Sequence, residues 1–557
     1  MSNDNKKYRP FNQVKIPDRT WPDKVISNAP LWCSVDLRDG NQALITPMNL
    51  DQKVELFKLL VKIGFKDIEV GFPSASAVEF DFLRTLVDQD LIPDDVRIQV
   101  LVQAREHLIK KTFESLQGVK KAVVHLYNST SIAQRKIVFN KDQDEIIAIA
   151  LEGVDLIKKF ESTTDTKIFL EYSPESFTGT EVEFAAKICN AVTNRWGVSK
   201  QRPVIINLPA TVEMATPNTY ADMIEWMSRH LENREHILIS THTHNDRGTS
   251  VAATELALMA GADRVEGTLL SNGERTGNVD IITLALNMTT QGVESHLDFS
   301  NVDEVVKTVE DVTKIATHVR HPYVGELVYT AFSGSHQDAI KKGMDFQKKR
   351  SDNFWEVPYL PIDPSDVGRT YEDIIRINSQ SGKGGIAYLL EEEYGYILPK
   401  KMHPTVGKLI QDESDKSGVE ISKEKILEIF EHYYFKERSH VAFERFAVVS
   451  RVEEQGLITV EADFIIDGTK HTLTGQGNGP IDACKKALIQ KYTNEFSIVS
   501  FSEHSMGKSS TADAVAYIEI EDSQGVSTFG VGRNPNTTIA SINALMCALN
   551  LAFGQKS

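Results

Sequence analysis

The chain has 557 residues, which is too many for one hydrophobic core and predicts about three or four domains. Its formal net charge of −17, from 61 Lys and Arg against 78 Asp and Glu, argues against a general nucleic-acid or anionic-membrane surface. The four cysteines form no C-x-x-C pair, so neither a disulfide framework nor a thiolate metal site is indicated, and a reducing cytoplasm fits best.

Residues 1–30 contain several prolines and charges and predict an extended N-terminal arm. They lack the apolar centre of a signal peptide, so no secretory signal is expected. No apolar run reaches the ~18 residues that are needed to span a bilayer. We therefore expect a cytoplasmic protein without a membrane segment.

Short apolar strands that end in polar residues recur over residues 31–322, with amphipathic helical patterns between them. Eight strand-then-helix units at roughly 25 to 40 residue spacing predict an α/β fold, the (β/α)8 TIM barrel. The strands are expected within residues 31–42, 67–73, 97–103, 121–130, 167–176, 203–213, 237–246 and 264–278. An open doubly wound sheet is the alternative, but no G-x-G-x-x-G follows the first strand to support it.

The carboxyl ends of barrel strands converge on one mouth, where catalysis takes place. Many polar groups would be costly in a closed core, so we expect those at the strand ends to form a site at the mouth. They are Asp36, Arg38, Asp39, Glu69, His125, Glu171, Ser173, Glu175, Asn207, Thr211, Glu213, His242, His244, Glu266, Asn272, Glu274, Arg275 and Asn278.

Two histidines mark the end of the seventh strand, in the stretch ILISTHTHND. Side chains two apart in a strand share a face, so His242 and His244 form half of a divalent-metal site. A pair of hydrogen-bonded polar residues is the alternative interpretation. With Asp39 and Asn278 they supply two nitrogens and two oxygens, a set that suits Mn, Mg, Zn or Co. Such a metal could chelate a 2-oxo acid and polarise its ketone.

Arg38 and the mouth carboxylates are candidates for the rest of the chemistry. Arg38 could hold the oxygen that becomes an alkoxide, although an ion pair at the barrel rim is the alternative. Among Glu69, Glu175, Glu213 and Glu274 at least one is expected to be structural. Glu175 is the predicted acid/base group because it lies beyond its strand and can face the mouth.

After residue 322 the barrel pattern stops. Residues 323–440 contain FSGSHQDAIKKG, a Pro-rich stretch and NSQSGKGG, and predict one or two mostly helical linker subdomains. The Pro-rich part could be a simple connector.

Residues 441–557 predict an α+β domain with a pseudo-twofold repeat. GQGNGP at 475–480 corresponds to GVGRNP at 530–535, and each segment leads into a helix rich in small residues. We expect glycine turns with bare N–H groups at the helix starts, which suit a carboxylate or another anion. Tight turns alone are the alternative. The glycines concerned are Gly475, Gly477, Gly479, Gly530 and Gly532.

A family resemblance rests on motifs along the whole chain. In order they are DLRDGNQAL, EVGFPSAS, HLYNSTS, YSPESFTGTE, NLPATVEMATPN, HTHNDRGTSVAA and NGERTGNVD, followed by SGSHQDA, PIDPSDVGRTYE and the C-terminal glycine repeats. Together they closely resemble the 2-isopropylmalate synthases of the longer, leucine-regulated type. Homocitrate and citramalate synthases, which use 2-oxoglutarate and pyruvate, are the alternatives. DGNQ in place of DGEQ and the long C-terminal repeat favour the first family.

The resemblance implies an acyltransferase that condenses acetyl-CoA with 2-oxoisovalerate and water to give 2-isopropylmalate and CoA. It implies a metal held by Asp39, His242 and His244, with Asn278 at or near it. It implies catalytic roles for Arg38, Glu175, Tyr371 and His336, the last contributed across a dimer. The implied substrate-binding residues are Arg38, His125, Ser173, Thr211 and Glu274.

The resemblance also implies cofactors and partners. Mg²⁺ is the expected metal, with Mn²⁺ or Zn²⁺ as alternatives and K⁺ as a further activator. Leucine is the expected inhibitor, bound by the glycine segments of a regulatory domain in a homodimer. Neither ATP nor NAD is expected, because no P-loop or dinucleotide motif is present. A leucine-responsive metal sensor without turnover is an alternative of a different class, but intact Arg38, Glu175 and His336 argue against it.

Overall fold

The computed structural model describes residues 11–331, 333–369, 383–417, 421–436, 438, 440–452, 457–506 and 512–554. The chain divides into two compact units, residues 1–328 with 362–369, and residues 329–361 with 370–557. Each is described separately. Among the described residues no helix combines the length and the apolar character that crossing a membrane requires.

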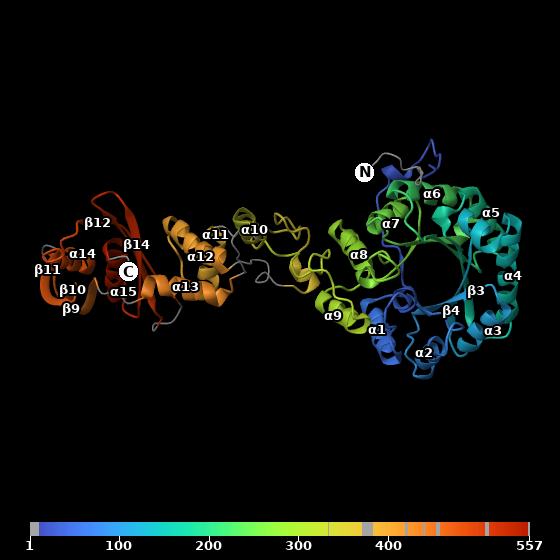
Figure 1. Cartoon of the computed structure of the whole chain (residues 1–557), viewed down its shortest axis with the longest axis horizontal. Helices are drawn as coiled ribbons and strands as arrows, with labels where there is room; N and C mark the ends of the chain where they lie inside the picture. The colour runs from blue at the N-terminus through green and yellow to red at the C-terminus, as the bar shows by residue number, and fades with distance from the viewer. Residues whose placement is uncertain are drawn as a thin grey trace. The chain divides into compact units, whose positions relative to one another are not determined.

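The first unit is a closed barrel of eight parallel strands in sequence order, surrounded by helices (Figure 1). This confirms the predicted TIM barrel. The strands are β1 (Leu31–Ser34), β2 (Asp67–Gly71), β3 (Arg97–Gln103), β4 (Lys121–Ser129), β5 (Lys167–Glu175), β6 (Val204–Ala210), β7 (Ile237–Thr243) and β8 (Arg264–Gly267). The helices are α1 (Leu50–Ile63), α2 (Ala77–Asp88), α3 (Glu106–Ser115), α4 (Gln143–Glu161), α5 (Val182–Trp196), α6 (Pro217–His230), α7 (Ser250–Met259), α8 (Ile281–Thr290) and α9 (Val302–Thr313).

Local sequence signals set the ends of these helices. The Asn49 side chain accepts a hydrogen bond from the Gln52 backbone while Gln52 bonds back to residue 49, so a capping box starts α1. Gly64 ends α1 with a φ of 115°, a conformation that favours glycine. Such signals bring α1 back against the barrel so that β2 can pair with β1.

The N-terminal arm is fastened to α6. Arg19 donates two hydrogen bonds of 2.9 Å to Asp222, and the Trp21 indole N–H donates to the same carboxylate at 2.8 Å. The Thr20 hydroxyl donates to Glu225 at 2.8 Å. Residues 16–23 therefore form part of the barrel unit.

A buried ion pair holds α1 to α2. The Lys53 side chain is fully buried and contacts Glu79, whose side chain is 16% exposed. Replacing Glu79 by glutamine leaves an uncompensated buried ammonium, so we expect the free energy of unfolding of the barrel to fall by about 3–5 kcal/mol. Denaturant unfolding followed by tryptophan fluorescence measures this. Asp95→Asn breaks the exposed Lys66–Asp95 pair and should leave the midpoint unchanged. Equal shifts of the unfolding midpoint in both variants would show that the burial of Lys53 does not increase the cost of losing its partner.

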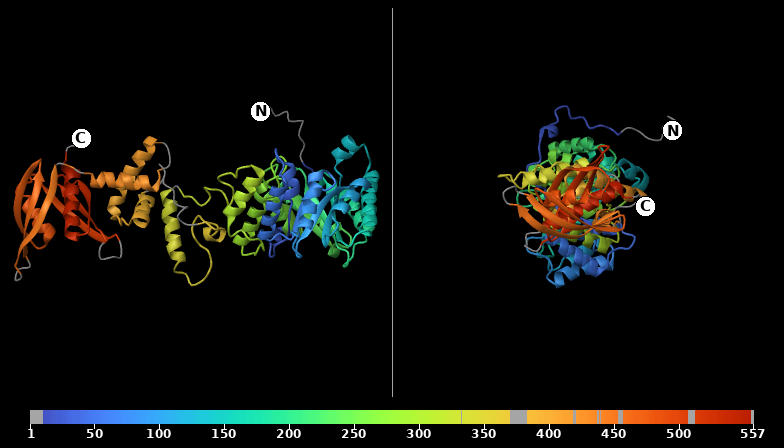
Figure 2. Two further views of the ribbon diagram at one scale, coloured as in Figure 1. Left: turned by 90° about the horizontal axis from the view of Figure 1, so that it is seen from below. Right: turned by 90° about the vertical axis from the view of Figure 1, so that its left-hand side faces the viewer.

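The second unit begins with helices α10 (Gly334–Gln347), α11 (Lys383–Tyr394), α12 (His403–Ser417) and α13 (Lys423–Phe435). Two three-stranded antiparallel sheets follow, in the orders β11-β10-β9 and β12-β13-β14. Their elements are β9 (Val441–Val452), β10 (Leu457–Ile466), β11 (Thr469–Gly477), α14 (Pro480–Leu488), β12 (Phe496–Ser505), β13 (Ala514–Asp522), β14 (Ser527–Asn534) and α15 (Thr537–Phe553). Figure 2 shows these strands and α15, coloured orange to red, lying together in both views. The predicted helical linker and twofold α+β repeat are confirmed.

The glycine segments differ from the predicted turns. Gly475 and Gly477 lie in β11, Gly530 and Gly532 lie in β14, and none of them has a positive φ. A Cβ at Gly532 would come within 2.0 Å of the Ala540 carbonyl oxygen in α15. These glycines allow close strand–helix packing. Gly479 is different, because it is the N-cap of α14 and a Cβ there would meet nothing within 4 Å.

Candidate active site

A cavity of about 320 Å³ opens at the carboxyl ends of the barrel strands. Residues from several strands converge on it, as the mouth hypothesis predicted. The predicted residues that line it are Arg38, Asp39, His125, Ser173, Glu175, Asn207, Thr211, His242, His244, Glu274 and Arg275.

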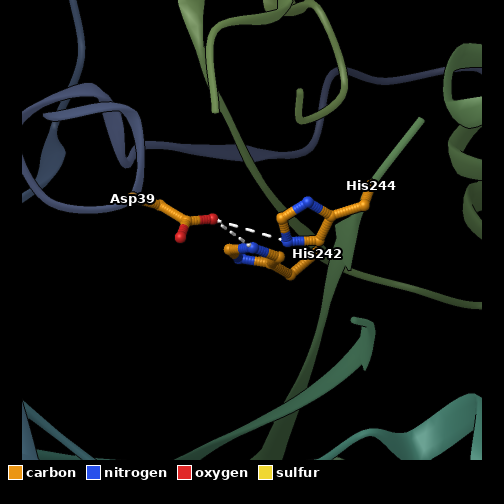
Figure 3. Close-up of side chains that lie close together, drawn as sticks. All are labelled: Asp39, His242 and His244. Atoms are coloured by element: carbon orange, nitrogen blue, oxygen red, sulfur yellow. Dashed lines mark hydrogen bonds and ion pairs between the residues drawn. The ribbon is translucent and has the colours of Figure 1, made fainter. Parts of the chain in front are cut away.

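Three buried side chains in this cavity could hold a metal ion. Asp39 comes from a π-helical turn, Asp36–Gly40, that follows β1, while His242 and His244 lie at the end of β7. One ligand atom of each lies within 4.8 Å of the others. His242 Nε2 is 3.0 Å and His244 Nε2 is 3.6 Å from Asp39 Oδ2, so both rings turn toward one carboxylate oxygen (Figure 3). A carboxylate and two imidazoles fit a divalent metal.

Asn278 lies beside this donor set. Its Nδ2 donates to Asp39 Oδ2 at 2.7 Å, and its Oδ1 is buried without a hydrogen-bond partner among the described atoms. Rotating the amide by 180° would present Oδ1 to the same place. Gly273, with a φ of 149°, makes room, because a Cβ there would come within 1.9 Å of Oδ1.

Burial and neighbouring charges shift the pKa values of the two imidazoles in opposite directions. Burial opposes the charge on His242, but hydrogen bonds with Asp39 and Glu266 raise its pKa to about 9. Burial and the charge on His242 lower the pKa of His244 to about 4. Burial also opposes the charge on Asp39, yet Arg38 and His242 hold the pKa of that carboxyl well below its usual range. The carboxylate is therefore ready to bind a cation.

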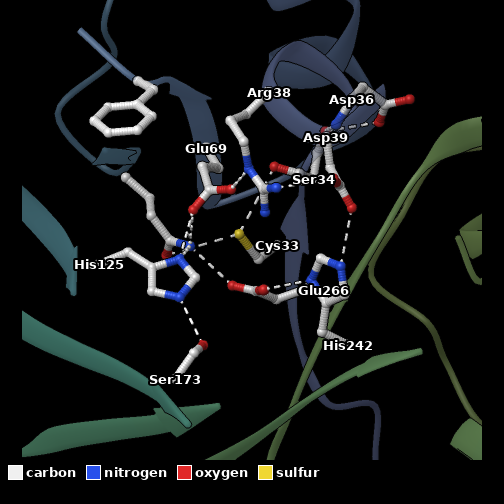
Figure 4. A network of polar contacts seen from close by, with 12 residues as sticks. Cys33, Ser34, Asp36, Arg38, Asp39, Glu69, His125, Ser173, His242 and Glu266 are labelled. Carbon is white, nitrogen blue, oxygen red and sulfur yellow. Dashed lines mark hydrogen bonds and ion pairs between the residues drawn. The ribbon is translucent and has the colours of Figure 1, made fainter. Parts of the chain in front are cut away.

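A second polar chain starts at Arg38 and leads into the barrel (Figure 4). Arg38 donates to Asp39 Oδ1 at 2.8 Å and also to Glu69. Glu69 Oε2 lies 2.7 Å from His125 Nδ1, and His125 Nε2 lies 2.7 Å from the Ser173 hydroxyl. Glu69 thus orients both Arg38 and His125 and is one of the carboxylates with a structural role.

Glu69, His125 and Glu266 form another cluster with metal-ligand spacing. The Gln99 amide already lies among them and donates to Glu69 Oε2 at 2.7 Å and Glu266 Oε1 at 2.8 Å. The Gln99 amide therefore already supplies these two carboxylates with the hydrogen-bond donor that they need in the absence of a metal.

Glu175 and Thr211 face the same cavity. Glu175 accepts a hydrogen bond from the Ser129 hydroxyl. The Thr211 oxygen accepts from the Ser176 backbone N–H at 2.9 Å, so the Thr211 hydroxyl hydrogen remains available to a ligand.

Several predicted mouth residues lie elsewhere. Glu171 and Glu266 are fully buried inside the barrel. Glu213 accepts hydrogen bonds from the Arg247 backbone and the Thr249 hydroxyl and joins two loops. Asp36 accepts from the Leu269 backbone N–H at 3.0 Å. The idea that polar groups would avoid the closed core was wrong here: Glu266 has buried hydrogen-bond donors, and Glu171 lies beside the buried Arg264 guanidinium.

Two predicted catalytic residues, His336 and Tyr371, lie beyond the barrel in the sequence. His336 lies on α10 in the second unit, is exposed, and stacks on Tyr359 with ring centroids 4.1 Å apart. Tyr371 lies outside the described residues. Both roles stay predictions.

Four lining residues were missing from the prediction: Gln42, Leu101, Tyr127 and Pro209. Three of them were detectable, since Leu101, Tyr127 and Pro209 lie two residues from the inward-facing Gln99, His125 and Asn207. Because side chains two apart share one face of a strand, extending each inward-facing position by two residues would have identified these three.

Comparisons with known proteins match the whole chain. The HMGL-like family model covers residues 29–309, the model "Alpha-isopropylmalate synthase, post-catalytic domain-like" covers 326–391, and the "LeuA allosteric (dimerisation) domain" model covers 420–553. A 2-isopropylmalate synthase from Clostridium acetobutylicum is 54% identical over 550 residues, 98% of each chain. Those of Kineococcus radiotolerans and Pseudomonas syringae pv. tomato are 53% and 51% identical, covering 98% or more of each chain.

The chain belongs to the 2-isopropylmalate synthase family. This confirms the predicted family and the assignment as an enzyme, and the homocitrate and citramalate alternatives are not favoured. In this 2-isopropylmalate synthase family member, the HMGL-like model matches the barrel and the LeuA model matches the twofold α+β repeat.

Proposed function

We propose that the chain condenses acetyl-CoA with 2-oxoisovalerate and water to give 2-isopropylmalate and CoA. The observation that carries this proposal is the convergence of three side chains that could hold a metal with Arg38, Glu175 and Thr211 on one cavity. Family membership at more than 50% identity supports it.

The cavity offers a place for the oxo acid. A divalent ion held by Asp39, His242 and His244 would act as a Lewis acid toward the keto oxygen. The free Thr211 O–H can donate to the substrate carboxylate. Arg38, fixed by Asp39 and Glu69, presents its remaining N–H groups to the oxygen that gains negative charge.

Proton removal from the acetyl methyl group of acetyl-CoA requires a base beside that methyl carbon. Glu175 is the base candidate in the cavity, and its carboxylate is oriented by Ser129. His336 is the second candidate, contributed by the partner of a homodimer. The new carbon–carbon bond gives a thioester, and its hydrolysis releases CoA and the second carboxylate of the product.

Part of the cavity lining is apolar and suits a branched apolar side chain. Leu101 and Pro209 supply apolar surface. Among the described lining residues both arginines already have partners, Arg38 with Asp39 and Glu69, and Arg275 with Asp246. With Arg38 directed to the reacting oxygen and Arg275 paired with Asp246, a second carboxylate, as in 2-oxoglutarate, would find no further arginine there.

We further propose Mg²⁺ as the metal, with Mn²⁺ or Zn²⁺ as alternatives, and K⁺ as an activator. The ligand set of nitrogen and oxygen supports all three divalent ions. The match to a dimerisation domain supports a homodimer. The four free, buried cysteines support a cytoplasmic location.

Leucine is the proposed inhibitor, bound by the C-terminal repeat. At Gly479 the start of α14 has open space, and the helix N-terminus favours a carboxylate. Gly479→Asp places a competing charge there and should also cap α14, so we expect folding and turnover to persist while leucine inhibition weakens by about tenfold or more. A leucine titration of CoA release measures this, with Gly479→Ala as the matched control. Unchanged inhibition in Gly479→Asp would place the leucine site elsewhere.

Mass spectrometry of the products tests the proposed reaction. Purified protein, Mg²⁺, acetyl-CoA and 2-oxoisovalerate are expected to yield 2-isopropylmalate and CoA in equal amounts. CoA release without 2-isopropylmalate, or no turnover with any of the three divalent metals, would overturn the proposal.

A further inference from the structure

Behind the metal-ligating residues, the barrel interior contains a carboxylate that contacts only one of the two imidazoles. Glu266 Oε2 lies 2.8 Å from His242 Nδ1, and the Glu266 side chain is fully buried (Figure 4). We propose that Glu266 is a positioning residue, which fixes the ring orientation and the tautomer of His242 so that Nε2 faces the metal. This inference rests on the proposed metal-dependent function and goes beyond its ligand set.

The geometry of His242 supports this role. An imidazole has two ring nitrogens, and the hydrogen bond at one determines which is free to bind a metal. Because Nδ1 faces Glu266, Nε2 is directed to Asp39 Oδ2 at 3.0 Å. His244 lacks such support, since its Nδ1 is buried without a hydrogen-bond partner among the described atoms. Of the two imidazoles, only that of His242 is therefore oriented by a hydrogen bond at Nδ1 among the described atoms.

Glu266 is itself held by donors from three strands. The Gln99 amide and the Arg264 guanidinium each donate to Oε1 at 2.8 Å, and the Asn207 amide donates to Oε2 at 3.1 Å. With the His242 bond, each carboxylate oxygen has two donors. The carboxylate cannot rotate without breaking them, so its position determines that of His242.

Arg264 extends this support toward the bottom of the barrel. Its side chain is fully buried and donates to Asp67 Oδ2 at 3.1 Å, Ser240 Oγ at 3.1 Å and Gln99 Oε1 at 2.7 Å. A buried guanidinium with this many acceptors is rigid. The charge on Arg264 also compensates the buried charge of Glu266.

Glu171 offers a matched control within the same interior. It is equally buried and lies 3.3 Å from Arg264 Nη1 and 3.4 Å from His125 Nε2. No contact joins it to His242 among the described side chains. Glu171 does interact electrostatically with Glu266. A general disturbance of the buried network would therefore weaken Mn²⁺ binding in Glu171→Gln as well, whereas loss of the Glu266–His242 bond would weaken it only in Glu266→Gln.

Mn²⁺ binding to metal-depleted protein tests the inference without any substrate. We expect Glu266→Gln to weaken Mn²⁺ binding by about 10–100-fold, measured by electron paramagnetic resonance of the free ion. Glu171→Gln should bind Mn²⁺ as the wild type does, and thermal unfolding should show that both variants are folded. Wild-type affinity in Glu266→Gln, or equal weakening in both variants, would overturn the role. Since no substrate is present, failure of the proposed condensation would leave this result unaffected.

A second measurement covers the case in which Glu266→Gln does not fold. In wild-type protein loaded with Zn²⁺ and labelled with ¹⁵N-histidine, we expect His242 to carry a hydrogen on Nδ1 and none on Nε2. The His242 signal is identified by its absence in His242→Gln. A hydrogen on Nε2 in the loaded protein would contradict the proposed positioning.

Discussion

His242→Ala or His244→Ala is expected to lower metal-dependent turnover by about a thousandfold or more, because a Lewis-acid metal contributes several kcal/mol. Both imidazoles turn toward Asp39 Oδ2 in the same cavity, so removing either leaves an incomplete ligand set. The fold should persist, since the barrel strands remain paired. The measurements are kcat at a fixed metal concentration and the bound-metal content of the purified variants.

His236→Ala is the control for this comparison. His236 lies just before β7 but outside the cavity lining, so turnover should remain at the wild-type value. Normal kcat of His242→Ala or His244→Ala, at metal concentrations near the wild-type requirement, would remove both residues from the metal site.

His336→Ala is expected to lower kcat by about 10²–10⁴-fold, the usual contribution of a proton-transfer group. Oxo-acid affinity should change only slightly, because Asp39, His242, His244 and Thr211 would still hold that substrate. Stopped assays give kcat, and calorimetry with 2-oxoisovalerate alone gives the affinity. If affinity fell as much as kcat, His336 would be a binding or structural residue.

Mixed dimers test whether His336 acts on the partner's site. His336→Ala and His242→Ala should each be almost inactive, but in an equal mixture half of the dimers would combine one intact His336 with one intact metal site. If the histidine acts across the dimer, activity should recover to about a quarter of the wild type, as twofold symmetry requires. No recovery would show that both residues must come from the same subunit.

The barrel could be predicted from sequence because each strand ends in polar residues and is followed by an amphipathic helix. The strand-end position alone did not separate the mouth from the interior. His242 and Glu266 are partners across β7 and β8, but one lines the cavity and the other lies beneath it. Depth along a tilted strand depends on register, and a single sequence does not encode register explicitly.

The buried network was the part that sequence reasoning missed. Gln99 and Arg264 were not candidates, because neither stands at the carboxyl end of its strand. Their importance comes from contacts between β3 and β8, through the 2.7 Å bond from Arg264 to Gln99. Polar residues at alternate positions of an otherwise apolar strand were the available signal.

In the glycine repeat, by contrast, the sequence signal was recognised but the role of the glycines was misinterpreted. The 55-residue spacing correctly predicted two equivalent units, yet the glycines suggested turns where the structure has strands. Glycine frees φ and also permits close packing, and a sequence does not distinguish these uses. Only Gly479 keeps the open space that a ligand at the helix start requires.

The most direct test of the central claim compares three oxo acids in one assay. Release of free CoA is followed with a thiol reagent while acetyl-CoA is held constant and 2-oxoisovalerate, pyruvate or 2-oxoglutarate is varied. We predict the highest kcat/KM for 2-oxoisovalerate, by about tenfold or more over pyruvate, which lacks the two methyl groups that Leu101 and Pro209 would contact. We predict little release with 2-oxoglutarate. A higher kcat/KM for pyruvate or 2-oxoglutarate would contradict the assignment of 2-oxoisovalerate as the substrate.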